Sequence, residues 1–288
     1  MQIVVTSNCQ THPIAQALQN FLPEHGVVAE WKLGGIDELR SKLKASISKQ
    51  DFFWVTSCTH QEIDFLSNEK WFKPHQIVRI PDIFFEAFHP DMTYFQLENG
   101  EICESIVGPY HSKLIMWDFL QGKSVKDTLQ DFTYETFEKL GYLSGWDSSI
   151  EKLRASLSIG DLKPSTLDDF LLSKKNFMHS FNHPNQAVLT KVAAEVAEIL
   201  QPEIKIEGID SGLVEKDLLF FYGPVYAYLK PIANFFGEEG FNYFRNSEGK
   251  IFDLESYIEG LFSSYRSLDI LEIQRYFNEL SYSFGANL

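Results

Sequence analysis

Short apolar runs alternate with segments of helical periodicity over about the first ninety residues, and this alternation constrains the fold more than any other feature. The apolar runs are QIVVTS (2–7), GVVAEW (26–31), DFFWVTS (51–57) and QIVRIPDIFF (76–85). Helical patterns separate them, among them one over 13–21 that begins at Pro13 and one over 36–47. Strands that alternate with helices are typical of βαβ units. The sequence therefore predicts an α/β fold with a mainly parallel N-terminal sheet.

From about residue 110 onward, helical patterns replace this alternation. Ser124 and Asp127 form a capping pattern before one helix, and segment 184–200 is apolar nearly all round. Near the end, one helical stripe collects Leu254, Tyr257, Ile258, Leu261, Phe262 and Tyr265. Such a stripe is typical of a helix packed on a core, and a partner-binding face is the alternative. We expect an α/β core over residues 1–110 and a large, mainly helical portion over 111–288 that packs on it.

Charge and cysteine content exclude several classes of protein. The 288 residues carry a net charge of −15, which gives no general attraction to nucleic acid or to anionic membranes. No uncharged apolar run approaches the length of a membrane span, and the start of the chain does not resemble a secretory signal. Three widely spaced cysteines give no disulfide framework. We expect a cytoplasmic protein that acts on small molecules, and its oligomeric state stays open.

A polar cluster directly follows the first predicted strand. It runs from Ser7 to His12 and contains Asn8, Cys9 and Gln10. In doubly wound sheets, ligands bind at the carboxyl ends of the strands, which is where this cluster lies. A thiol just before a helix is expected to favour the thiolate, and the two amides with nearby main-chain N–H groups offer an oxyanion hole. The alternative is that Cys9 is a small buried hydrophobic residue at a strand end.

A nucleophilic thiol needs a base, and His183 in HSFNHPNQAVL is the best candidate. Pro184 suits the first helical position, which places His183 at a helix cap and favours a neutral imidazole. A histidine that only caps the helix or forms a buried hydrogen bond is the alternative. His89, with Asp91 to orient it, and His111 are further candidates for the same cleft.

A metal site is a competing interpretation of the same region. Cys9, His12, Cys58 and His60 follow two strands that are expected to be neighbours. Their spacing does not match a standard zinc pattern, so we expect no metal. The sequence also contains no GxGxxG, P-loop or GxSxG motif, which leaves the common nucleotide and hydrolase-elbow sites without support.

Four segments in sequence order carry a resemblance to a known family. They are VVTSNCQTHPIAQAL, IPDIFFEAFHPDM, GPYHSKLIMWDFLQG and FNHPNQAVLTKVA, joined later by PVYAYLKPIANFFG at 224–237. Together they resemble the WcbI-type family of bacterial capsule and polysaccharide biosynthesis proteins, over about residues 1–235. Ser7 stands where the family commonly has Gly before Asn-Cys-Gln. A thiol after the first strand and a downstream His-Pro are also similar in layout to SGNH-type hydrolases, a variant of the Rossmann-like arrangement.

The resemblance implies an acetyltransferase that uses coenzyme A or acetyl-coenzyme A and a sugar hydroxyl, on a nucleotide sugar or a glycan, as acceptor. Carried over by motif, it implies as pocket residues Asn8, Cys9, Gln10, His89, Asp91, His111 and His183, with Cys9 and His183 as the catalytic pair. Further candidates for the cofactor site are Ser7, His12, Lys113 and Asn182. Coenzyme A carries phosphates, so we expect local cations, with Arg79, Lys113 and Lys123 as candidates.

Two mechanistic routes and two other functions stay open from the sequence. In the first route, Cys9 takes the acyl group as a thioester. In the second route, His183 activates the sugar hydroxyl for direct attack on acetyl-coenzyme A. An esterase that removes acyl groups from a polysaccharide is the first alternative function. A protein that binds coenzyme A or a glycan without turnover is the second. Aromatic residues are abundant, with 25 Phe and 12 Tyr, and predict an aromatic core or a slot for the pantetheine arm.

Overall fold

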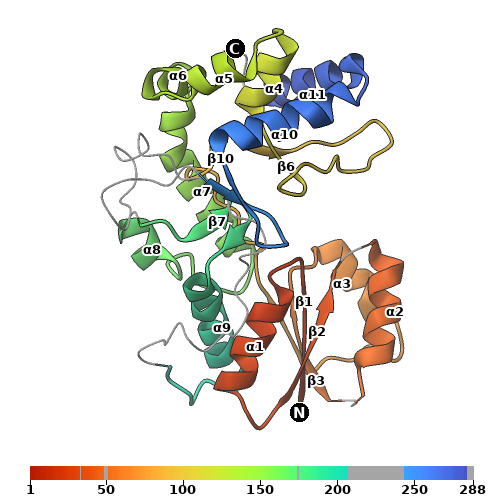
Figure 1. Ribbon diagram of the computed structural model, residues 1–288. Helices are drawn as coiled ribbons and strands as arrows, with labels where there is room; N and C mark the ends of the chain where they lie inside the picture. The colour runs from red at the N-terminus through yellow and green to blue at the C-terminus, as the bar shows by residue number, and fades with distance from the viewer. Residues whose placement is uncertain (33, 49–50, 174, 207–242, 284–288) are drawn as a thin grey trace. The chain divides into compact units, whose positions relative to one another are not determined.

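The structure is a computed structural model that describes residues 1–32, 34–48, 51–173, 175–206 and 243–283. The described residues form two compact units that alternate along the chain (Figure 1). As far as they are described, residues 1–84, 150–173 and 182–218 make the first unit, and residues 85–149, 174–181 and 219–288 make the second. The expected division of the chain into a core over residues 1–110 and a helical portion over 111–288 stays a prediction. The family-like segment 224–237 lies outside the described residues.

A four-stranded parallel sheet forms the centre of the first unit. Its strands β1 (Gln2–Ser7), β2 (Gly26–Trp31), β3 (Phe52–Thr56) and β4 (Gln76–Arg79) lie in the order β2-β1-β3-β4. Val5 of β1 pairs with Ala29 on one side and with Val55 on the other. The strand order reverses between β1 and β3, which defines a doubly wound sheet. The predicted α/β fold with a parallel N-terminal sheet is confirmed.

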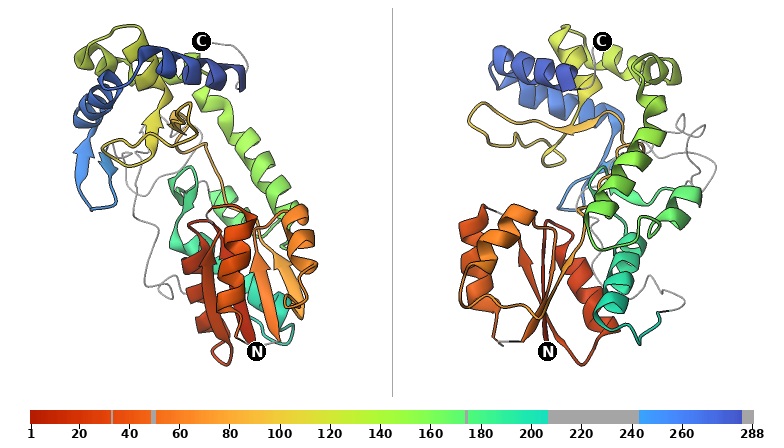
Figure 2. Two further views of the ribbon diagram at one scale, coloured as in Figure 1. Left: turned by 90° about the vertical axis from the view of Figure 1, so that its right-hand side faces the viewer. Right: turned by 180° about the vertical axis from the view of Figure 1, so that it is seen from behind.

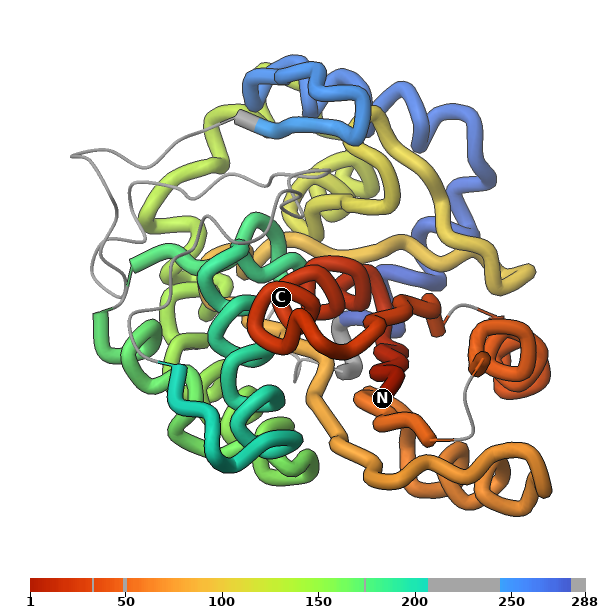
Figure 3. Tube along the Cα trace, turned by 90° about the horizontal axis from the view of Figure 1, so that it is seen from below, coloured from red at the N-terminus to blue at the C-terminus, as the bar shows by residue number. Residues whose placement is uncertain are grey.

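Helices cover both faces of this sheet. Helices α1 (Thr11–Phe21) and α9 (Gln186–Leu200) pack together on one face, and α2 (Ile36–Ser46) and α3 (His60–Ser67) lie on the other (Figures 1 and 3). Between β1 and β3, the Thr6 hydroxyl donates to the Thr56 hydroxyl at 2.7 Å and accepts from the Trp54 indole at 2.9 Å. These buried polar groups are therefore satisfied inside the sheet layer. The unit also contains α8 (Asp168–Ser173), β8 (His183–Pro184) and the end of α7 (Gly145–Ile159).

Two element boundaries differ from the sequence-based expectation, and both differences matter for the site. Helix α1 begins at Thr11, so Pro13 occupies its third position, where its missing N–H group is also harmless. Strand β4 ends at Arg79, far short of residue 85, and the Ile80 amide makes a last bond to the Thr56 carbonyl at 2.8 Å. Pro81 then has no N–H group to continue the ladder. The chain therefore leaves the sheet and crosses its carboxyl edge.

The second unit is largely helical around an aromatic core. Its elements are β5 (Met92–Tyr94), β6 (Tyr110–Ser112), α4 (Lys113–Leu120), α5 (Val125–Asp131), α6 (Tyr134–Lys139), a 3-10 turn (Tyr142–Ser144), the start of α7, β7 (Met178–Ser180), β9 (Tyr243–Arg245), β10 (Ile251–Asp253), α10 (Leu254–Arg266) and α11 (Ile270–Ser283). Helices α4, α10 and α11 lie beside one another (Figure 2). The predicted stripe on α10 packs in this core, where its residues from Tyr257 to Tyr265 are buried and Leu254 is partly buried. No helix in the described ranges is long and apolar enough to cross a bilayer.

Candidate functional site

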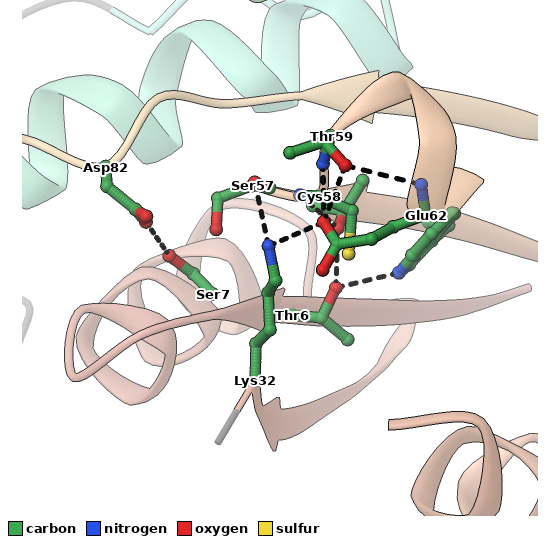
Figure 4. A network of polar contacts seen from close by, with 10 residues as sticks. Thr6, Ser7, Lys32, Ser57, Cys58, Thr59, Glu62 and Asp82 are labelled. Carbon is green, nitrogen blue, oxygen red and sulfur yellow. Dashed lines mark hydrogen bonds and ion pairs between the residues drawn. The ribbon is translucent and has the colours of Figure 1, made fainter. Parts of the chain in front are cut away.

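Polar residues gather at the carboxyl edge of the sheet in the first unit (Figure 4). Ser7 ends β1, Lys32 follows β2, Ser57 follows β3 and Asp82 follows β4. The Lys32 ammonium lies 2.8 Å from the Glu62 carboxylate and 3.5 Å from the Ser57 carbonyl oxygen, which ties the ends of β2 and β3 to α3. This is the edge at which the strand order reverses, and it is where the sequence predicts a ligand.

The loop that carries Cys9 is held in shape by its own hydrogen bonds. The Asn8 side-chain oxygen accepts from the Gln10 amide at 2.9 Å, and the Asn8 carbonyl accepts from the Thr11 hydroxyl at 2.7 Å. The Thr11 hydroxyl also accepts from the Ser7 amide at 2.9 Å. The Cys9 thiol lies 3.7 Å from the Asn8 side-chain oxygen. The Asn8 Nδ2 group makes no hydrogen bond within the described residues, so it stays available as a donor to a ligand.

Gln10 connects this loop to two distant parts of the first unit. Its Nε2 donates to the Ile83 carbonyl at 3.0 Å and to the Asn182 carbonyl at 3.2 Å, and its Oε1 accepts from the Ile83 amide at 3.2 Å. The side chain is completely buried. Both amide hydrogens are therefore used inside the protein, and Gln10 does not supply the oxyanion contact expected from the sequence. Gln10 thereby links the Cys9 loop to Asn182, the residue that directly precedes His183.

The protonation state of Cys9 differs from the sequence-based expectation. Burial and the nearby negative charge of Asp82 raise the pKa of the Cys9 thiol to about 12, while the Cys9 and Gln10 amides act in the opposite direction. The expected thiolate at the start of α1 is thus wrong for this structure, because desolvation outweighs the backbone amides. The residue Cys9 is partly buried, whereas Cys58 and Cys103 are buried. Cys9 is therefore the least buried of the three cysteines.

His183 lies in β8 rather than at the cap of α9. The N-cap of α9 is Asn185, whose side-chain oxygen accepts from the Val188 amide at 3.2 Å. Asn is a better N-cap than His, which explains why the helix starts two residues later than expected. His183 is 6% exposed and belongs to the first unit, as Cys9 does. The Gln10 bridge to Asn182 therefore brings together the two segments for which a shared site is predicted.

Four predicted site residues belong to the second unit: His89, Asp91, His111 and Lys113. Both ring nitrogens of His111 face protein atoms, the Tyr265 hydroxyl at 3.0 Å and the Cys103 carbonyl at 2.9 Å. Burial lowers the pKa of His111 to about 4 and raises the pKa of Asp91. The contacts of His111 assign it to the core of its own unit. A place beside Cys9 stays a prediction for all four residues.

The three cations expected to contact the phosphates of coenzyme A form ion pairs or ring contacts within the protein. Arg79 of the first unit lies 3.3 Å from the Asp161 carboxylate and contacts the His60 ring. In the second unit, Lys123 lies 2.8 Å from Asp118 and 2.6 Å from Asp131, and the Lys113 ammonium lies 5.2 Å from the centre of the Tyr142 ring.

His12 is exposed at the start of α1, and its ring centre lies 5.7 Å from that of Trp31. The competing interpretation, in which Cys9, His12, Cys58 and His60 hold a metal, gains no support. In the described part of the chain, no three His, Cys, Asp or Glu side chains gather as a metal would need.

Sequence reasoning missed Asp82 as a member of this site. Its carboxylate accepts a hydrogen bond from the Ser7 hydroxyl at 2.8 Å, across 75 positions of the chain. The signal was present, because Pro81 cannot continue a strand ladder and so predicts that the residue after it lies beyond the strand, at the carboxyl edge. The strand predicted over 76–85 includes Pro81 and Asp82, so Asp82 was assigned to the strand and not to the edge of the sheet.

The fold and the site define a doubly wound α/β protein with a thiol-bearing loop at the switch point of its sheet. A family model described as polysaccharide biosynthesis enzyme WcbI matches residues 2–204. The chain belongs to this family of polysaccharide biosynthesis enzymes. No curated protein matches the chain.

A solved structure of WcbI has the same fold. Its TM-score is 0.73 at 14% sequence identity, over 97% of this chain and 94% of the other. That protein is described as a novel polysaccharide biosynthesis enzyme, in a native form without a disulfide bond between coenzyme A and one of its cysteines.

Proposed function

We propose that the protein is an acetyltransferase that moves an acyl group from acetyl-coenzyme A to a sugar hydroxyl during the synthesis of a polysaccharide such as a capsule. Membership of the family of polysaccharide biosynthesis enzymes supports a role in polysaccharide synthesis. The observation that carries the proposal is the Gln10 bridge, because it joins the Cys9 loop to the segment of His183 at the switch point. A cytoplasmic location stays a prediction.

The similar structure supports coenzyme A as the acyl carrier. A disulfide needs two sulfur atoms at about 2 Å, so a cysteine that can pair with coenzyme A lies at its thiol end. In the present chain, Cys58 and Cys103 are buried, and Cys9 is the one cysteine that is only partly buried. We therefore assign the Cys9 loop to the thioester end of acetyl-coenzyme A. Asn8 Nδ2 and the backbone amide of Cys9 are the donors suited to the thioester oxygen, because the Gln10 backbone amide already donates to the Asn8 side-chain oxygen.

His183 is proposed as the general base. It accepts the proton of the sugar hydroxyl while the hydroxyl oxygen bonds to the acyl carbon. The bond between the acyl carbon and the coenzyme A sulfur then breaks, and His183 returns the proton to that sulfur. Arg79 is the candidate phosphate contact in the first unit, where it ends β4 at the carboxyl edge. Lys113 and Lys123 remain candidates in the second unit.

The proposal is tested by incubating the protein with acetyl-coenzyme A and a panel of nucleotide sugars, and by following free thiol and acetylated sugar. We expect both products in equal amounts. His183→Asn should lower turnover about 100-fold or more, because asparagine cannot accept the proton. His75→Asn is the matched control, since His75 is exposed beside β4 at the opposite edge of the same sheet.

Other results would contradict the proposal. Release of acetate without an acetylated sugar would identify an esterase. Thermal stabilisation by coenzyme A without any turnover across the panel would identify a binding protein.

A further inference from the structure

A carboxylate and an aromatic ring flank Ser7 at the carboxyl edge of the sheet. The Ser7 hydroxyl donates to Asp82 Oδ1 at 2.8 Å, and Figure 4 shows this contact. Ser7 is also the register partner of Trp31, the last residue of β2. In the strand order β2-β1-β3-β4, Trp31 adjoins β1 on one side, and Asp82 reaches it from beyond β4 on the other.

The segment that carries Asp82 is fixed against the Cys9 loop. Ser7, which holds the carboxylate, stands two residues before Cys9. Ile83, the residue after Asp82, is bonded through both of its backbone groups to the side chain of Gln10, at 3.0 and 3.2 Å. These contacts place Asp82 at the part of the site that the proposed function assigns to the thioester.

Trp31 lies on the same face of the sheet as this loop. Register partners in parallel strands project to the same face, and the ring of His12 on α1 has its centre 5.7 Å from that of Trp31. The two ring planes are inclined by 58°, so His12 does not stack flat on the indole. Trp31 is 38% exposed although it ends a strand. The indole therefore offers an apolar surface to a ligand at this edge.

The Asp82 carboxylate keeps an acceptor for a ligand. The side chain is only partly buried, and no hydrogen bond reaches Oδ2 and no ion pair forms within the described residues. A carboxylate accepts strong hydrogen bonds from hydroxyl groups and repels phosphates and other carboxylates. This side of the site thus suits a neutral polyol and not an anion.

We propose that Asp82 and Trp31 form the subsite that binds the acceptor sugar as a neutral pyranose. The carboxylate accepts hydrogen bonds from ring hydroxyls, and the indole packs on a C–H face of the ring. This assignment rests on the proposed function, because the acceptor hydroxyl has to reach the thioester carbon beside the Cys9 loop. The nucleotide of coenzyme A lies at the far end of the pantetheine arm, away from this point.

Saturation-transfer difference NMR tests sugar binding without turnover. The probes are the methyl glycosides of glucose, galactose, mannose and N-acetylglucosamine. We expect the C–H protons of at least one of them to receive saturation from the native protein. Trp31→Leu and Asp82→Ala should each weaken this binding about ten-fold, the size expected for one hydrogen bond to a charged group or one lost apolar contact. Phe65→Leu and Asp64→Asn, which change exposed residues of α3 in the same unit, are the matched controls and should bind as the native protein does.

Methyl glucuronide tests the charge of the subsite. It should bind the native protein about ten-fold more weakly than methyl glucoside, because its carboxylate meets that of Asp82. Asp82→Asn should remove this difference, since asparagine still accepts from the Ser7 hydroxyl but carries no charge. A difference that persists in Asp82→Asn would contradict the role of the carboxylate.

Thermal stabilisation by coenzyme A separates the sugar subsite from the alternatives. Trp31→Leu and Asp82→Ala should keep the native thermal shift with coenzyme A. A loss of this shift would overturn the proposal, because it would assign Trp31 to the adenine ring or both residues to the structure of the loop. Equal saturation transfer in native and variant proteins, or none to any glycoside, would overturn it as well. Transfer without any acetylated product would support the subsite and reject the proposed reaction, so the two failures are distinguishable.

Discussion

The Gln10 side chain makes three hydrogen bonds that join the Cys9 loop, the segment after β4 and the segment of His183. All three partners are backbone groups of Ile83 and Asn182, and the amide itself is fully buried. A buried backbone group without a partner is costly, so this arrangement specifies one geometry for the site. At the scale of the residue, the site thus depends on an amide that is not available to a ligand.

Gln10→Ala should lower the free energy of unfolding by about 1–3 kcal/mol, because it leaves these buried backbone groups unsatisfied. It should also weaken stabilisation by coenzyme A, since the Cys9 loop and the His183 segment lose their bridge. Urea unfolding and thermal shift measure the two effects. Gln19→Ala is the matched control, because Gln19 lies on the same α1 helix and bonds to the His25 carbonyl at 3.0 Å and the Val27 amide at 3.1 Å. The bridging role of Gln10 would be contradicted if both variants reduced the thermal stabilisation by coenzyme A equally.

The sequence could predict that Gln10 belongs to the site, but not how it contributes. Its position after a buried strand is a local signal. Its partners Ile83 and Asn182 lie 73 and 172 positions away, and no spacing rule identifies them. The same limit applies to Cys9, because its thiol is governed by burial and by Asp82 rather than by the nearby start of α1.

At the scale of elements, the strands and helices of the first unit were predictable because their periodicity is local. Strands β1 and β2 have the predicted bounds, and α9 is shorter than predicted because Asn185 caps it. Strand β4 is shorter because Pro81 interrupts the ladder. In the second unit, His111 joins β6 to α10 through the Tyr265 hydroxyl at 3.0 Å.

This element contact makes stability depend on pH. Burial lowers the pKa of His111 from about 6.5 to about 4, so the unfolded chain binds a proton more readily than the folded one between these values. The contribution of the neutral ring to the free energy of unfolding is therefore fully present above about pH 6.5. This free energy then falls by about 3 kcal/mol in total as the pH decreases toward 4. His111→Gln should flatten the pH dependence of the unfolding free energy in this window, measured with urea. Equal slopes for the variant and the native protein would contradict the assignment.

At the scale of the whole molecule, the chain alternates between two units, and each is described by its own contacts. The residues predicted for one pocket divide accordingly, with Cys9, Gln10 and His183 in the first unit and His89 and His111 in the second. Sequence periodicity predicts elements but not which distant segments share a core, so this division could not be foreseen. The first unit alone contains the thiol, the bridge and the proposed base.

The most direct measurement is a crystal structure of the protein with coenzyme A bound. We expect the coenzyme A sulfur at the carboxyl edge of the sheet, in contact with the Cys9 loop and within reach of the His183 ring, with Gln10 still bonded to Ile83 and Asn182. A sulfur bound elsewhere, for example beside Cys103 in the second unit, or a Cys9 loop separated from the His183 segment, would contradict it.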